Sequence, residues 1–173
     1  MSEIGFEPEP ALGGDPQWSD QGVSYDFDEE PISEPVIVRS HFVTTVLVSH
    51  NGATWLPAVL TQLARTTRPP EVIVGVDARS TDTSLEILTQ SLGADRVVAL
   101  AENQGFGACV DAGLGLVPRP DFLADARPAD TIEWIWLLHD DCAPDSTALE
   151  QLLLTADRHP SVAVLGPQDS RLA

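Results

Sequence analysis

The stretch Trp134-Ile135-Trp136-Leu137-Leu138-His139-Asp140-Asp141 decides the fold, because its apolar run stops without a turn residue at two adjacent carboxylates. Strands that are buried on both faces read as continuous apolar segments. In open α/β sheets, ligands bind outside the carboxyl ends of the strands. The stretch therefore predicts a buried strand that brings two carboxylates to a ligand-binding edge.

Strand and helix patterns alternate on both sides of this stretch. Apolar, β-branched segments predict five strands, at 42–49, 71–76, 96–100, 132–138 and 162–165. Apolar residues at helical spacing predict helices over 56–63, 85–92, 108–116 and 149–156, and a Pro-rich surface loop is expected over 117–130. This alternation indicates an α/β fold with a mainly parallel sheet flanked by helices.

The composition divides the chain into two parts. The 173 residues suit about one domain, and the net charge of −18 is concentrated at the start, where residues 1–41 hold 10 of the 27 acidic groups and only Arg39 as a cation. We predict a disordered acidic tail over 1–41, with a docking segment around Trp18 and Tyr25 as the alternative, and a folded domain over 42–173. So acidic a chain disfavours nucleic acid as a partner, and an anionic substrate would need a metal or placed arginines.

We expect no signal peptide, because the first residues lack a basic start followed by an apolar core, and we expect no membrane span, because no apolar run is long enough. Two cysteines, Cys109 and Cys142, are too few for a disulfide framework, so reduced thiols are expected. A zinc site at Cys142 and His139 is disfavoured because no second Cys or His has zinc-finger spacing. These features predict a cytoplasmic protein.

Polar groups follow three separate strands of the predicted sheet. They are His50-Asn51 after the first strand, Asp77 after the second and His139-Asp140-Asp141 after the fourth. Because parallel strands share their carboxyl edge, we expect these side chains to converge. Each has a plainer interpretation by itself: a turn at Asn51, and local hydrogen bonding at Asp77 and the Asp pair.

The converging carboxylates favour a cation site. Mg²⁺ commonly takes one or two carboxylates together with substrate phosphates, which makes Asp140 and Asp141 the candidate ligands. Asn103 and Gly105 precede a predicted helix, and glycine there permits close approach of a ligand to the backbone. The chain lacks both a GxGxxG fingerprint after its first strand and a lysine-containing phosphate loop, so the two commonest nucleotide-binding motifs are excluded.

Four segments together resemble family 2 glycosyltransferases, over roughly residues 43–166, which is the nucleotide-sugar-binding half of the GT-A fold. They are Thr44–Gly52, Glu71–Asp82, Asn103–Gly107 and Trp136–Asp141. The resemblance implies that Ser49, His50 and Asn51 line the base and ribose of the donor, that Asp77 hydrogen-bonds the base, and that Asn103 and Gly105 lie near the donor. It further implies that Asp141, with an oxygen from Asp140, holds Mg²⁺ or Mn²⁺ at the diphosphate.

The resemblance implies inverting transfer of a sugar from a nucleoside-diphosphate donor to a glycan or lipid-linked acceptor. The chain contains arginine but no lysine and is rich in Ala and Pro, which is typical of a GC-rich bacterial genome. Such enzymes often build cell-envelope glycans in bacteria. We therefore expect this one to act in the cytoplasm or at the inner face of the plasma membrane.

The sequence departs from the family pattern at four positions. The family often has an acid or Asn at the position of Ala78 and a Gly at that of Arg79. It often has an Asn at the position of Asp111 and an acid at that of His139. We find no motif for the catalytic base of inverting members, which comes from the acceptor half. The chain is therefore expected to be a donor-binding half that is incomplete at its C-terminus. The alternatives are a non-catalytic nucleotide-binding or scaffold module and, last, a nucleotidyltransferase.

Overall fold

The computed structural model describes residues 39–117, 128 and 130–167. Their elements, in chain order, are β1 (His41–Ser49), α1 (Leu56–Ala64), β2 (Val72–Asp77), α2 (Ser84–Leu92), the short 3-10 helix η1 (Ala94–Arg96), β3 (Val97–Ala99), α3 (Phe106–Leu114), β4 (Ile132–His139) and α4 (Ala148–Arg158). The four strands form one sheet in the order β3-β2-β1-β4, and every neighbouring pair is parallel. The predicted α/β class is confirmed.

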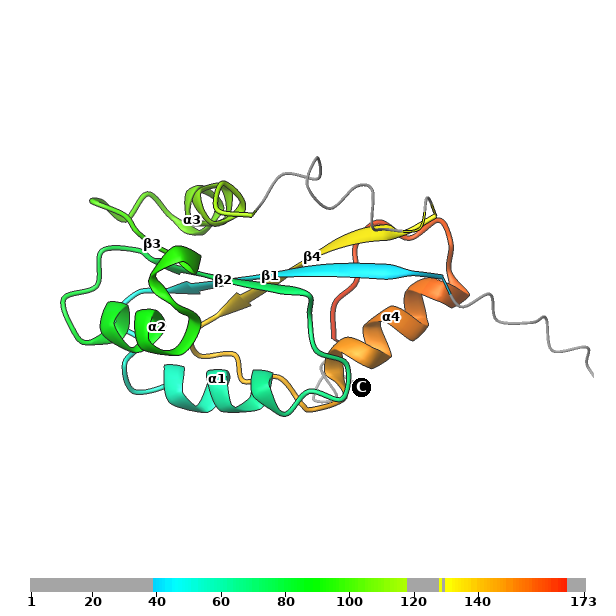
Figure 1. Cartoon of the computed structure of the whole chain (residues 1–173), viewed down its shortest axis with the longest axis horizontal. Helices are drawn as coiled ribbons and strands as arrows, with labels where there is room; N and C mark the ends of the chain where they lie inside the picture. The colour runs from blue at the N-terminus through cyan, green and yellow to red at the C-terminus, as the bar shows by residue number, and fades with distance from the viewer. Residues whose placement is uncertain (1–38, 118–127, 129, 168–173) are drawn as a thin grey trace, which may run out of the picture. The chain divides into compact units, whose positions relative to one another are not determined.

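Helices lie on both faces of this sheet (Figure 1). Alternate residues of β1 point to opposite faces: Leu47 packs with α1 and α2, whereas Val46 packs in the cluster that contains Cys109 of α3. Val43 packs with Leu149 and Leu153 of α4, on the same face as Leu47. Strand β1 is thus buried on both faces, which explains its continuous apolar sequence.

The strand register brings the polar ends of three strands to one edge. Ser49 at the end of β1 pairs with Asp77 at the end of β2, and Val48 pairs with His139 at the end of β4. Asp140 follows directly, and its backbone N–H donates to the Val48 carbonyl at 3.1 Å. The convergence predicted from the sequence therefore results from parallel pairing in register.

The predicted fifth strand over 162–165 is wrong. These residues have no strand conformation, and Val164 is 85% exposed. Among the described residues, nothing pairs with the outer edge of β4. A β-branched pattern shows that a segment fits a half-buried sheet surface, but the strand forms only where a neighbour supplies ladder hydrogen bonds.

Two further expectations fall largely outside the described residues, namely the acidic tail over 1–41 and the loop over 117–130. On the face of the sheet that α3 covers, Ile135 and Leu137 of β4 remain exposed. Both cysteines are free, as expected, with Cys109 buried and Cys142 exposed. None of the described helices has the length and apolar character needed to span a membrane.

Candidate functional site

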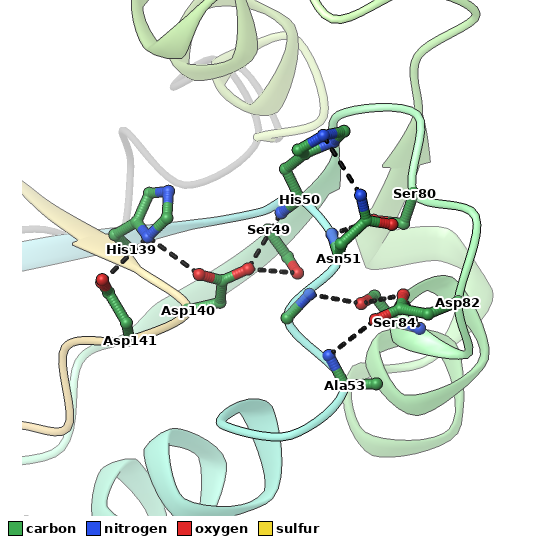
Figure 2. Close-up of polar contacts among 11 residues, drawn as sticks. Ser49, His50, Asn51, Ala53, Ser80, Asp82, Ser84, His139, Asp140 and Asp141 are labelled. Carbon is green, nitrogen blue, oxygen red and sulfur yellow. Dashed lines mark hydrogen bonds and ion pairs between the residues drawn. The ribbon is translucent and has the colours of Figure 1, made fainter.

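A buried carboxylate joins the ends of β1 and β4. The Asp140 side chain accepts hydrogen bonds at Oδ2 from the Ser49 hydroxyl (2.8 Å) and the His50 backbone N–H (2.9 Å), as Figure 2 shows. Asp140 is only 1% exposed. Gly52 passes so close that a Cβ there would lie 2.0 Å from the same oxygen, so the turn requires glycine at this position. Asp140 thus fixes where the polypeptide leaves β1.

The loops after β1 and β2 are joined by side chains rather than by a backbone ladder (Figure 2). The contacts are Asn51 N–H to Ser80 Oγ (2.9 Å), Gly52 N–H to Ser84 Oγ (2.8 Å), Ala53 N–H to Asp82 Oδ2 (3.1 Å) and Thr81 N–H to Asn51 Oδ1 (2.8 Å). Asn51 has a positive φ of 54°, which asparagine tolerates better than most residues. Two loops far apart in sequence therefore form one rigid unit at the sheet edge.

Asp82 acts through Ser84 at the start of α2. It accepts hydrogen bonds from the hydroxyl and the backbone N–H of Ser84, and the hydroxyl contact is the main reason why the pKa of Asp82 lies below its usual value. No side-chain cap is found at Thr83, which precedes the helix. The oxygen that satisfies the first backbone N–H of α2 thus comes from Asp82, the residue before Thr83.

His50 is held in one tautomer by its neighbours. Its Nδ1 lies 2.8 Å from the Ala78 carbonyl oxygen, which can only accept, so Nδ1 carries the proton. Its Nε2 then accepts from the Asn51 side-chain amide at 3.2 Å. The exposed ring is therefore oriented at the carboxyl edge, beside the end of β2.

Asp77 carries the clearest sign of a binding function. It is 2% exposed, and its Oδ2 accepts the Ser80 N–H at 2.9 Å. Its Oδ1 is buried and has no hydrogen-bond partner among the described residues. Burial raises the pKa of the Cys109 thiol, and the charge of Asp77 raises it further. Buried polar oxygens are seldom left unpaired, so Asp77 Oδ1 is a candidate acceptor for a ligand N–H or O–H.

A His-Asp-Asp group occupies the end of β4. His139 Nδ1 lies 2.8 Å from Asp140 Oδ1 and 2.9 Å from Asp141 Oδ1. One ligand atom from each of the three residues lies within 4.8 Å of the others, which suits a bound cation. The Asp141 side chain is 62% exposed, so its oxygens remain accessible to a ligand. The Oδ2 of the buried Asp140, by contrast, already accepts two hydrogen bonds. The residues present therefore fit a divalent metal.

The predicted segment at Asn103 and Gly105 lies between β3 and α3. The Gly105 N–H donates to Asn103 Oδ1 at 3.0 Å, and Gly105 has a φ of 91°, which favours glycine. The next residue, Phe106, lies with its ring centroid 6.3 Å from that of His139. Asp111 is exposed on α3. Phe106 thus brings this segment close to His139 at the end of β4.

Sequence reasoning missed Ser84, Gly52 and Phe106. Ser84 is fully buried and joins both loops, yet a serine at a helix start reads as ordinary capping. Gly52 reads as a turn residue, and Phe106 reads only as part of the segment that leads into a helix. No local signal distinguishes them, because their importance depends on residues distant in sequence.

The parallel sheet flanked by helices matches folds of the GT-A type. The family model described as Glycosyl transferase family 2 matches residues 44–172. The chain belongs to this family. A search of curated proteins gives no match.

Solved structures support the fold. The structure of S. aureus TarS 1-349 in complex with UDP is 20% identical, with a TM-score of 0.54, and the match covers 75% of this chain and 38% of that one. A second structure of S. aureus TarS is 19% identical, with a TM-score of 0.52, and covers 69% of this chain and 20% of that one. The chain thus spans less than two fifths of the length of the TarS chains that it matches.

Proposed function

We propose that this chain is the donor-binding part of a metal-dependent, inverting glycosyltransferase that passes a sugar from a uridine-diphosphate donor to a hydroxyl of a glycan or lipid-linked acceptor. Membership in glycosyl transferase family 2 supports sugar transfer. The similarity to a TarS structure in complex with UDP supports the nucleotide. Cell-envelope glycan synthesis is the proposed role, in the cytoplasm or at the inner face of the plasma membrane.

The unpartnered oxygen of Asp77 carries the proposal. An ionised carboxylate can only accept hydrogen bonds. Uracil offers a ring imide N–H to such an acceptor, whereas the corresponding ring nitrogens of adenine and cytosine carry no hydrogen. A uridine base would therefore satisfy Asp77 Oδ1, which has no partner among the described residues. His50 and Asn51, fixed beside the end of β2, are proposed to line the base and ribose, with Asn103 and Gly105 near the donor.

The arrangement of strands suits a nucleoside diphosphate. Asp77, Ser49 and Asp140 stand side by side at the ends of β2, β1 and β4. Two strand spacings separate Asp77 from Asp140, about 10 Å. A base at Asp77 would thus direct its diphosphate toward the group at the end of β4.

Asp141 is proposed to hold the metal directly, while Asp140 supplies Oδ1 and keeps the loop in place. A divalent cation there would neutralise charge that develops on the departing diphosphate. Ser49 contributes by fixing the Asp140 carboxylate. None of the described residues is assigned as the catalytic base.

Calorimetric titration of the protein with UDP, GDP and dTDP, with and without Mn²⁺, tests the proposal. We expect UDP to bind most tightly, and Asp77→Asn to weaken UDP binding about tenfold, because a hydrogen bond to a charged group is lost. Asp141→Asn should abolish the gain in affinity that Mn²⁺ gives. Asp95→Asn, at an exposed position in η1, is the matched control and should bind as wild type.

Failure of all three nucleotides to bind, or unchanged UDP affinity in Asp77→Asn, would contradict the donor site. A UDP-release assay with UDP-sugars then separates an enzyme from a non-catalytic nucleotide-binding module. Tight UDP binding without release from any UDP-sugar would favour the module.

A further inference from the structure

His139 places a nitrogen atom between the two carboxylates of the proposed metal site. Its Nδ1 is 2.8 Å from Asp140 Oδ1 and 2.9 Å from Asp141 Oδ1. In Figure 2 the ring lies above both acids, with Nδ1 directed toward them. Carboxylates only accept hydrogen bonds, so Nδ1 carries a hydrogen in these contacts. A cation that bridges the two oxygens would take the place of that hydrogen, with the ring hydrogen then on Nε2.

The hydrogen bonds of Asp140 leave few alternatives for the ligand set. Its Oδ2 already accepts the Ser49 hydroxyl and the His50 N–H, and Gly52 closes the space beside that oxygen. Asp140 can thus offer only Oδ1, the oxygen that faces His139. A cation at this edge would thus have three candidate protein ligands among the described residues, namely Asp141, one oxygen of Asp140 and the imidazole of His139.

We propose that His139 is a direct nitrogen ligand, and that this mixed nitrogen and oxygen set makes the site prefer Mn²⁺, Co²⁺ or Zn²⁺ over Mg²⁺ and Ca²⁺. Imidazole suits the later first-row metals, whereas Mg²⁺ and Ca²⁺ require oxygen ligands. The inference rests on the proposed function, because it concerns the metal of the proposed donor site.

Pulsed EPR of the Mn²⁺-loaded protein tests the ligand directly. We expect electron spin-echo modulation from an imidazole ¹⁴N, and we expect it to disappear in His139→Asp, which provides only oxygen ligands. The affinity for Co²⁺ relative to Mg²⁺ should fall about tenfold in the same variant, because an imidazole nitrogen that suits Co²⁺ is replaced by a carboxylate oxygen that suits Mg²⁺. His139→Asn, which is closer in size to histidine, repeats the measurement should His139→Asp fail to fold.

Two matched controls remove other sources of these signals. His159→Gln changes an exposed histidine at the end of α4, and Cys142→Ser removes the neighbouring exposed thiol. Both should keep the ¹⁴N modulation and the preference for Co²⁺.

The outcomes separate this inference from the proposed function. Mn²⁺ that binds without ¹⁴N modulation, or an unchanged metal preference in a folded His139 variant, overturns the role of His139 and leaves the donor site standing. If UDP binds in EDTA but Mn²⁺, Co²⁺ and Mg²⁺ all fail to bind, the metal site itself is refuted. If neither UDP nor any metal binds, the proposed function fails as well.

Discussion

Replacing Gly52 by alanine tests whether Asp140 organises the loop after β1. The new Cβ would lie 2.0 Å from Asp140 Oδ2, 2.4 Å from its Cγ and 2.7 Å from its Cβ. Real Cβ contacts are longer than about 3 Å, so the carboxylate must move by about 1 Å or more. That movement breaks the hydrogen bonds from Ser49 and His50.

The expected cost follows from those two hydrogen bonds. Each bond to a charged group contributes about 1.5–3 kcal/mol, and partial relaxation of the loop recovers part of the sum. We expect Gly52→Ala to lower the free energy of unfolding by about 3 kcal/mol. Urea titration followed by tryptophan fluorescence measures this loss. Gly107→Ala is the matched control, because a Cβ at that helical position meets nothing within 4 Å, and it should be neutral or slightly stabilising.

A double-mutant cycle isolates the contact. Asp140→Gly removes the three atoms nearest to the new Cβ, whereas Asp140→Ala would leave the Cβ of residue 140 in the way. We therefore expect Gly52→Ala to cost under about 1 kcal/mol in the Asp140→Gly background. Additive effects in the cycle, or a loss under about 1 kcal/mol for Gly52→Ala alone, would refute the reasoning.

Two further predictions concern ionisable groups. Maleimide at pH 7.5 should label the exposed Cys142 but not Cys109, because Cys109 is buried and burial raises the pKa of its thiol. Peptide mass spectrometry measures the labelling, and a labelled Cys109 in the native protein would contradict its buried position. The Ser84 hydroxyl lowers the pKa of Asp82, so this carboxylate stabilises the fold above its unfolded pKa of about 4 and loses that effect as pH falls through its lower folded value. Urea midpoints of wild type and Asp82→Asn should thus differ at pH 7 and converge toward pH 3, and a difference independent of pH would argue against this role.

The local patterns predicted most of the fold because each element carries its own period. The apolar run before His139 predicted β4, and apolar residues at helical spacing predicted α4. The predicted strand over 162–165 failed because strand formation depends on a pairing partner and not on composition alone.

The part of the candidate site that depends only on parallel strand pairing was predictable. Ser49, Asp77 and His139 meet because their strands lie parallel and in register. The joining of the two loops through Ser84 was not predictable, because it depends on a hydrogen bond between Ser84 and Gly52 across two different loops.

The sequence by itself determined the order of the four strands and four α-helices that the described residues form, the resemblance to the family and the edge where polar groups gather, although it also predicted a fifth strand that does not form. Only the tertiary structure divided the roles of two identical neighbours, since Asp140 is buried under three polar contacts while Asp141 faces solvent beside His139. The physical reason is that the Asp140 side chain is held by a hydrogen bond from Ser49, which lies 91 residues earlier in the chain. No local pattern can encode a contact over that separation.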